Sequence, residues 1–327
     1  MKQRKQWIDC LRGLCMAAIL LNHTEMYYAG TNLINYNLYV TDALCIFFFI
    51  SGYLIFKERC DVSLRHKLAS VLRTLVMPYF IFTTLMALPK AMAHGNAMDL
   101  LTLAKGVVMG QASWFVAALA VAELVFVGFL RLLKANLWAM AVVCGATFGM
   151  SMVMEAVGHG YFWQTDCALQ VMPLLLLGYV YHKYETRLTP NSLAIALPAI
   201  ALVGIKCYVA VGDVPLVMRY IDHANWLTFL VNAMVSPLFM CALFKRLPAG
   251  RMRLLCWTGR HTIVYYFICG GVPLMVGKLF CRLWGDYNGN YAFMVAAFCV
   301  VYAVATGITY LVYRFVPCIT GARGGRV

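Results

Sequence analysis

The sequence predicts an all-α integral membrane protein with about ten transmembrane helices and both termini in the cytoplasm. Of its 327 residues, 63% are hydrophobic and only 12% are charged, whereas soluble domains carry about 25% charged residues. The apolar residues fall into ten runs long enough to cross a bilayer. The Lys and Arg residues are concentrated in alternate connecting segments, and such an excess marks the cytoplasmic side.

The predicted spans follow one another with short connections, so we expect a single membrane domain over residues 1–327 without a soluble domain. With the N-terminus in the cytoplasm, twenty of the 27 Lys and Arg residues fall in inner segments, six fall in outer segments, and Arg12 lies within a helix. Pro residues inside two of the runs are compatible with membrane helices. The predicted spans are about 8–29, 38–56, 70–91, 112–133, 137–157, 166–183, 191–211, 224–244, 260–282 and 291–315.

Composition also argues against several classes of protein. The net charge of +14 does not predict nucleic-acid binding in so apolar a chain, because the positions of the charges follow membrane topology. The 13 cysteines, Cys10 among them, are scattered singly without the Cys/His spacing of a metal site, so we expect small packing residues and no metal. The basic and then apolar N-terminus is interrupted by Arg12 and lacks a cleavage site, which predicts a retained first helix.

The first span, DCLRGLCMAAILLNH, contains ionisable residues at membrane depth, where they are costly and usually functional. Arg12 and His23 are eleven residues apart. On a helix their side chains would point within about 20° of each other around the axis, so they share one face, and would lie about 16 Å apart along it. His23 could act as a general base, and Arg12 could hold a phosphate or carboxylate. The alternative is an Asp9–Arg12 pair at the interface and a structurally bonded His23, and spacing alone does not decide between them.

Four further groups carry polar or aromatic residues, and each has a structural alternative. Ser51-Gly52 interrupts an aromatic run in the second span, which favours packing against the first span, while Asp42 could pair with His23 or contact an acceptor. Arg65, Lys67 and Arg73 belong to a basic inner loop that could bind either anionic lipid or a phosphorylated cofactor. In the fourth span, Trp114 and the buried Glu123 could be functional, although the need of a buried Glu for a partner favours a structural pair. Two outer loops combine aromatic and polar residues, as an aromatic belt or a carbohydrate platform would, and one of them contains Asp166.

Several of these segments, in order, resemble the acyltransferase-3 family of integral membrane O-acyltransferases. The Asp9–His23 segment has the family's Arg, ten residues, then His. FFFISGYLIF at Phe47–Phe56 is similar to the family's second span, and RHKLASVLRTLVMPY at 65–79 to its basic segment. The other similar segments are Ser113-Trp114-Phe115, LLLLGYVY at 174–181 and GRHTIVYYFICG at 259–270, where Cys269 replaces a His of the relatives.

The resemblance implies transfer of acetyl from acetyl-CoA to hydroxyls of surface glycans or lipid-linked sugars. It implies essential roles for Arg12 and His23 and further roles for Ser51-Gly52 and Arg73. We therefore expect His23 to be a general base or acyl carrier, with Arg12, Arg65, Lys67 and Arg73 binding the CoA phosphates. Asp42, Ser51, Trp114, Glu123 and Asp166 are the candidate substrate-binding residues. The expected location is the bacterial inner membrane, with membrane lipid as a partner, and the rival hypothesis is a transporter or flippase of lipid-linked glycans.

Overall fold

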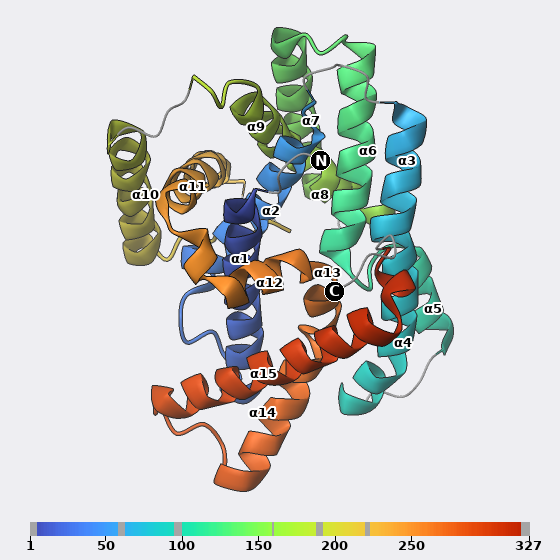
Figure 1. Cartoon of the computed structure of the whole chain (residues 1–327), viewed down its shortest axis with the longest axis vertical. Coiled ribbons are helices and arrows are strands. Elements are labelled where there is room, and N and C mark those ends of the chain that lie inside the picture. Colours follow the sequence, from blue (N-terminus) through green and yellow to red (C-terminus); the bar gives the residue numbers. More distant parts are fainter. Residues whose placement is uncertain are drawn as a thin grey trace.

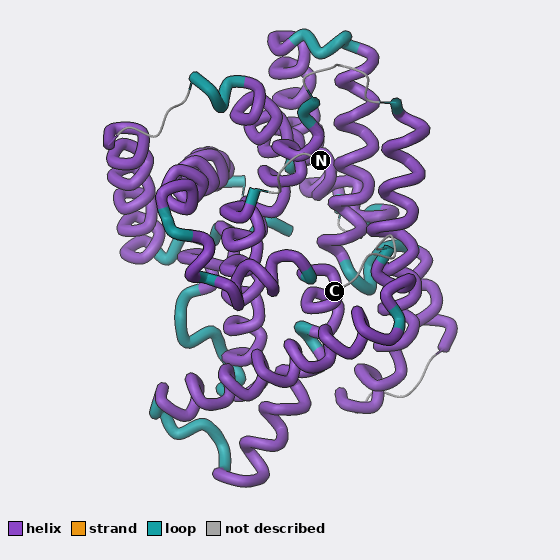
Figure 2. Tube along the Cα trace, viewed as in Figure 1, coloured by secondary structure: helices purple, strands orange, loops and turns teal. Residues whose placement is uncertain are grey.

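The computed structural model describes residues 5–57, 63–94, 100–158, 160–187, 192–219 and 223–321. Within these ranges the chain is helical and contains no strand (Figure 2). The α-helices are α1 (Gln6–Tyr28), α2 (Tyr36–Ile55), α3 (Leu64–Val71), α4 (Met77–His94), α5 (Leu100–Val108), α6 (Trp114–Leu132), α7 (Leu137–Val157), α8 (Thr165–Gln170), α9 (Met172–Lys183), α10 (Ser192–Gly212), α11 (Trp226–Arg246), α12 (Arg253–Arg260), α13 (Thr262–Ile268), α14 (Gly271–Trp284) and α15 (Tyr291–Phe315). A π-helical segment, η1 (Leu72–Val76), joins α3 to α4, and short 3-10 turns are η2 (Phe162–Gln164), η3 (Ala249–Arg251) and η4 (Pro317–Thr320).

Seven helices in the described part of the chain are long and apolar enough to cross a membrane, and the α13–α14 pair, bent by 49°, makes an eighth if it counts as one span. This confirms a multi-pass membrane protein. Two predicted spans look different in the structure. The segment predicted at 166–183 is divided at Val171 into α8 and the 12-residue α9, and α1 is less apolar because of residues such as Asp9 and Glu25. The count of ten and the cytoplasmic termini stay predictions.

Helix α1 lies at the centre of the bundle (Figure 1). It packs most extensively against α12, which crosses its N-terminal half, and also against α2, α14 and α15. Two glycines allow the α1–α12 crossing, because a Cβ atom at Gly259 would lie 1.7 Å from the Asp9 carbonyl oxygen and one at Gly13 would lie 1.9 Å from the Leu255 carbonyl oxygen. Backbone therefore rests directly on backbone, which fixes the position of Arg12 relative to α12 and α13.

A disulfide joins α1 and α12 next to this crossing. Cys10 of α1 and Cys256 of α12 form a disulfide, so the expectation that every cysteine is a packing residue is wrong for this pair. The two residues meet because the glycine contacts bring the helices close together. Four others that lie in apolar helices, Cys15, Cys45, Cys144 and Cys241, are buried free thiols as expected.

The small residues of the second span also have a different neighbour from the expected one. A Cβ atom at Gly52 would lie 2.0 Å from the Leu175 carbonyl oxygen, so this part of α2 packs closely on α9. The expectation of close packing is confirmed. The close approach at Gly52 is to α9 and not to the first helix, although α2 also packs against α1. The run LLLLGYVY contributes to the same contact, because a Cβ atom at Gly178 would also lie 2.0 Å from the Phe49 carbonyl oxygen.

A polar cluster around Glu185 joins the ends of four helices. The Glu185 carboxylate accepts hydrogen bonds from Lys5 at 2.6 Å and from the Tyr53 hydroxyl at 2.6 Å, and it lies 2.9 Å from Lys245. Lys5 precedes α1, Tyr53 belongs to α2, Glu185 follows α9 and Lys245 belongs to α11. Burial raises the pKa of Glu185, but the hydrogen bonds from Lys5, Tyr53 and Lys245 outweigh it and lower the pKa from 4.5 to about 2.

This cluster makes stability dependent on pH in a defined direction. Because the folded-state pKa of Glu185 lies below its unfolded value, its contribution is fully present above about pH 4.5 and is lost as the pH falls towards 2. We expect the melting temperature of the wild type in detergent to exceed that of Glu185→Gln at pH 7, and the difference to shrink between pH 4.5 and 3. A difference that stays constant over this range would show that the carboxylate does not stabilise the fold in this way.

Candidate active site

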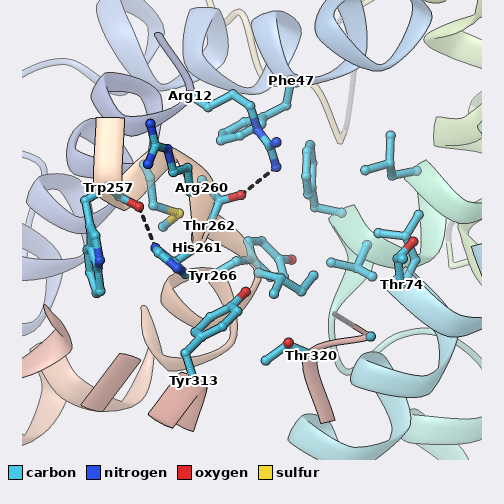
Figure 3. Close-up of a pocket in the computed structure, with 17 residues that line it drawn as sticks. Arg12, Phe47, Thr74, Trp257, Arg260, His261, Thr262, Tyr266, Tyr313 and Thr320 are labelled. Atoms are coloured by element: carbon cyan, nitrogen blue, oxygen red, sulfur yellow. Dashed lines mark hydrogen bonds between the residues drawn. The ribbon is translucent and has the colours of Figure 1, made fainter. Parts of the chain in front are cut away.

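The N-terminal half of α1 borders a cavity of about 640 Å³, which we call the arginine cavity. Figure 3 shows Arg12, Thr262, His261 and Tyr313 arranged around one space. The cavity lies between α1, α6, α12, α13 and the C-terminal turn η4. Its lining residues are Arg12, Met16, Phe47, Thr74, Leu75, Phe115, Val116, Leu119, Trp257, Arg260, His261, Thr262, Ile263, Tyr266, Tyr313, Thr320 and Gly321.

Two arginines give the arginine cavity its charge. The Arg12 guanidinium donates a hydrogen bond to the Thr262 hydroxyl at 2.7 Å, as the dashed line in Figure 3 shows. Arg260 forms an ion pair with Asp9 at 3.2 Å, and its side chain is 43% exposed while that of Asp9 is 4% exposed. Two guanidinium groups and no carboxylate stand among the residues that line the cavity, and this excess of positive charge suits an anionic ligand.

His261 faces the same cavity and was not identified from the sequence. Its ring lies 4.4 Å from that of Trp257 and 4.3 Å from that of Tyr313. Its Nδ1 atom is 2.7 Å from the Trp257 carbonyl oxygen. A carbonyl oxygen only accepts, so Nδ1 carries the hydrogen, and the neutral ring has its basic lone pair on Nε2.

The C-terminal turn closes the cavity beside Arg73. A Cβ atom at Gly321 would lie 2.3 Å from the Arg73 carbonyl oxygen, so η4 ends directly on the π-helical segment that holds Arg73. The Arg73 Nε atom is buried and has no hydrogen-bond partner among the described residues. The next two residues, Thr74 and Leu75, line the arginine cavity, which places the backbone of Arg73 at its edge.

His23 opens onto a second cavity of about 850 Å³, the histidine cavity, towards the other end of α1. The His23 ring lies nearly parallel to that of Tyr27, at 6.2 Å. Several amides and aromatic rings surround it, and the Asn22 amide donates to the Asn32 side chain at 2.7 Å. The lining residues are Asn22, His23, Met26, Tyr27, Asn32, Leu33, Asn35, Tyr36, Asn37, Trp114, Asp213, Val217 and Arg219.

A fully buried carboxylate holds one rim of the histidine cavity. Glu25 accepts a hydrogen bond from the Tyr291 hydroxyl at 2.9 Å and another from the Ile34 backbone N–H at 3.2 Å. The second bond fixes the loop between α1 and α2, from which Asn32 and Asn35 line the cavity. Glu25 therefore positions this loop beside His23.

Aromatic rings at the start of α6 separate the two cavities. Trp114 lines the histidine cavity and its neighbour Phe115 lines the arginine cavity. The Phe115 ring lies 4.9 Å from Phe48 and 5.5 Å from Tyr266. The Ser113 hydroxyl donates to the Tyr266 hydroxyl at 3.2 Å. We call these four residues, Ser113, Trp114, Phe115 and Tyr266, the aromatic partition.

The structure brings His23 and Trp114 together in the histidine cavity and places Arg12 in the arginine cavity. Other predicted site residues lie elsewhere. Asp42, considered as a partner for His23, forms an ion pair with Lys206 at 2.8 Å and accepts a hydrogen bond from Asn232 at 2.8 Å. Asp166 is buried, and its Oδ1 atom has no hydrogen-bond partner within the described residues.

Three further predicted residues belong to a cluster between α2, α3 and α6. Glu123 lies 2.8 Å from Lys67 and accepts a hydrogen bond from Ser51. Lys67 also lines a small pocket of about 260 Å³ together with Lys57 and His66. Arg65 is exposed on α3. These residues do not line either of the two larger cavities.

The residues that the sequence did not identify come from two places. His261 and Thr262 lie at the start of the GRHTIVYYFICG segment, which was recognised only as a resemblance. Asn32 and Asn35 of the histidine cavity lie in the short loop after α1, and single amides in a loop carry no spacing that predicts a site. Among the described residues, no group of three or more His, Cys, Asp or Glu side chains could hold a metal ion.

The chain matches a known protein family over nearly its whole length. The sequence model of the acyltransferase-3 family, described as an acyltransferase domain, matches residues 5–314. This range includes Arg12, His23, the aromatic partition and the α12–α13 wall. Neither a curated protein nor a solved structure matches the chain.

Proposed function

The chain belongs to the acyltransferase-3 family, and from this we propose that it transfers an acyl group, acetyl being the expected one, from acyl-CoA to a hydroxyl of a surface glycan or lipid-linked sugar. The observation that carries the proposal is that α1 borders two separate cavities, one with Arg12 and one with His23. A donor and an acceptor need such separate sites. The family match also favours an acyltransferase over the transporter or flippase that the sequence alone left open.

The arginine cavity is the proposed donor site. CoA carries phosphates, which Arg binds through charge-assisted hydrogen bonds, and Arg12 and Arg260 line this cavity. The buried Nε atom of Arg73 supports a role for this side chain too, because a buried donor without a partner is costly unless a ligand satisfies it. Arg65 and Lys67 would attract the nucleotide electrostatically from outside the cavity. With the N-terminus in the cytoplasm, this cavity faces the compartment that contains acyl-CoA.

The histidine cavity is the proposed acceptor site. Its amides offer donors and acceptors to sugar hydroxyls, and Trp114 and Tyr27 offer flat aromatic faces. His23 takes the proton from the acceptor hydroxyl as that oxygen attacks the thioester carbonyl, and the CoA thiolate leaves. As an acyl carrier, His23 would instead accept the acyl group first and pass it to the hydroxyl. In both cases the thioester must pass the aromatic partition.

Other parts of the proposal follow from the setting. The expected location is the inner membrane of a bacterium, where glycan precursors are available on one side and acyl-CoA on the other. Asp42 supports the helices around the site through its ion pair with Lys206. Glu123 does so through its ion pair with Lys67 and the hydrogen bond that it accepts from Ser51. Asp166 remains a candidate contact for the acceptor.

Purified protein and radiolabelled acetyl-CoA test the donor site. We expect Arg12→Ala to weaken acetyl-CoA binding about tenfold or more, because a hydrogen bond between charged groups contributes about 1.5–3 kcal/mol. Arg131→Ala is the matched control, because Arg131 is exposed at the end of α6. Equal affinity of Arg12→Ala and wild type would place the CoA phosphates elsewhere, and a wild type that binds no acyl-CoA would contradict the proposed donor.

A further inference from the structure

The arginine cavity has two chemically different walls. The wall formed by α12 and α13 carries the polar side chains of Arg260, His261 and Thr262 among aromatic and apolar ones. The residues of α6 that line the cavity, Phe115, Val116 and Leu119, are all apolar. Figure 3 places Arg260, His261 and Thr262 together beside the open space. The polar side chains of the α12–α13 wall suit the phosphates and amides of a CoA molecule. The α6 wall has no polar side chain, so only an apolar part of the ligand suits it.

The α6 wall ends at a pair of aromatic rings. Phe47 of α2 and Phe115 meet edge to face at 5.8 Å, and Phe48 packs against the other side of Phe115 at 4.9 Å. Phe48 is fully buried and Phe115 is 5% exposed. These rings pack on one another, so the apolar part of the cavity ends at them in this structure.

We propose that the α6 wall is an acyl-chain pocket, in which the alkyl part of the donor lies along Val116 and Leu119 and ends at Phe47 and Phe115. The pocket would thereby set the chain length of the acyl group and restrict the donor to short acyl-CoAs. This inference rests on the proposed function, because it assigns the acyl end of the same donor site. Its physical basis is burial, since each methylene moved from water onto an apolar wall strengthens binding about fourfold. A longer chain loses this gain when it must displace packed rings.

Two substitutions with opposite effects test the pocket without an acceptor. Labelled acetyl-CoA bound to the purified protein is displaced by unlabelled acetyl-, butyryl- or octanoyl-CoA. The ratio of two acyl-CoA affinities in the same variant does not depend on the nucleotide, because all three ligands share it. Phe47→Ala removes the end of the pocket, and we expect it to raise the octanoyl-to-acetyl affinity ratio at least tenfold. Leu119→Phe fills the space beside the α6 wall, and we expect it to lower the butyryl-to-acetyl affinity ratio about tenfold.

Matched controls lie on the protein exterior. Phe162→Ala removes a ring that is 58% exposed, and Leu132→Phe enlarges a side chain of α6 that is 76% exposed, so both should leave the affinity ratios unchanged. If Phe47→Ala does not fold, as its melting curve would show, Leu119→Phe carries the test by itself. Unchanged affinity ratios in the folded variants, with acetyl-CoA still bound, overturn the pocket and leave the donor site intact. A wild type that binds none of the three acyl-CoAs overturns the donor site itself.

Discussion

Replacing His23 by alanine is expected to lower acyl transfer about 100-fold or more, while acetyl-CoA affinity stays within about twofold of the wild type. The first effect follows from loss of the proposed general base, because such a base typically contributes 10²–10⁴-fold. The second follows from geometry, because His23 lines the histidine cavity and does not line the arginine cavity. Transfer of label from acetyl-CoA to membrane glycan, with equilibrium binding in parallel, measures both quantities.

A second histidine outside both cavities provides the control for this experiment. His66 is exposed on α3, and His66→Ala should transfer label at the wild-type rate. Mass spectrometry of wild-type protein incubated with acetyl-CoA alone distinguishes the two roles proposed for His23, because only an acyl carrier gains acetyl on this ring. A His23→Ala variant that keeps its transfer rate within about threefold would exclude both roles.

Replacing Gly259 by valine is expected to prevent correct folding or to lower the free energy of unfolding by more than about 4 kcal/mol. A Cβ atom there would lie 1.7 Å from the Asp9 carbonyl oxygen, so α12 and α1 would have to separate. Costs of this size arise when a substitution overpacks a close contact. Thermal unfolding in detergent and the yield of monodisperse protein are the measurements.

Gly307 of α15 provides the matched control for Gly259→Val. A Cβ atom at Gly307 has no neighbouring atom within 4 Å among the contacts that the structure describes, so Gly307→Val should leave the melting temperature nearly unchanged. If Gly259→Val behaved like Gly307→Val, the backbone contact between α1 and α12 would not exist in the folded protein.

Features that depend on residues close together in the sequence were predictable. The eleven-residue spacing of Arg12 and His23 placed both on one helix at different depths, and the structure assigns each to its own cavity. The apolar runs predicted most of the helices, because apolar length is a local property. The break in the run at 166–183 was missed, since Val171 is as apolar as its neighbours and Pro173 can begin a new helix as readily as interrupt one.

Features that depend on pairing across the chain were not predictable. The Arg12 side chain bonds to Thr262, 250 residues away, and Asp42 pairs with Lys206, 164 residues away. A hydropathy pattern gives no partner for a buried charge, so Asp42 and Glu123 could be recognised as residues that need one but not assigned to one. His261 was missed for the same reason, because a single His can be recognised as a site residue only when the residues that surround it in space are known.

The aromatic partition has a consequence for membrane energetics. Two polar cavities that meet end to end inside a bilayer would together form a continuous aqueous path, along which protons and small ions could flow. A proton that crosses at a potential of 100 mV dissipates about 2.3 kcal/mol. Phe115 and its neighbouring rings, packed at 4.9 to 5.8 Å, lie where such a path would run and would interrupt it. In the proposed reaction, a thioester would pass only by displacing these rings and filling their place, so the aqueous path would stay closed.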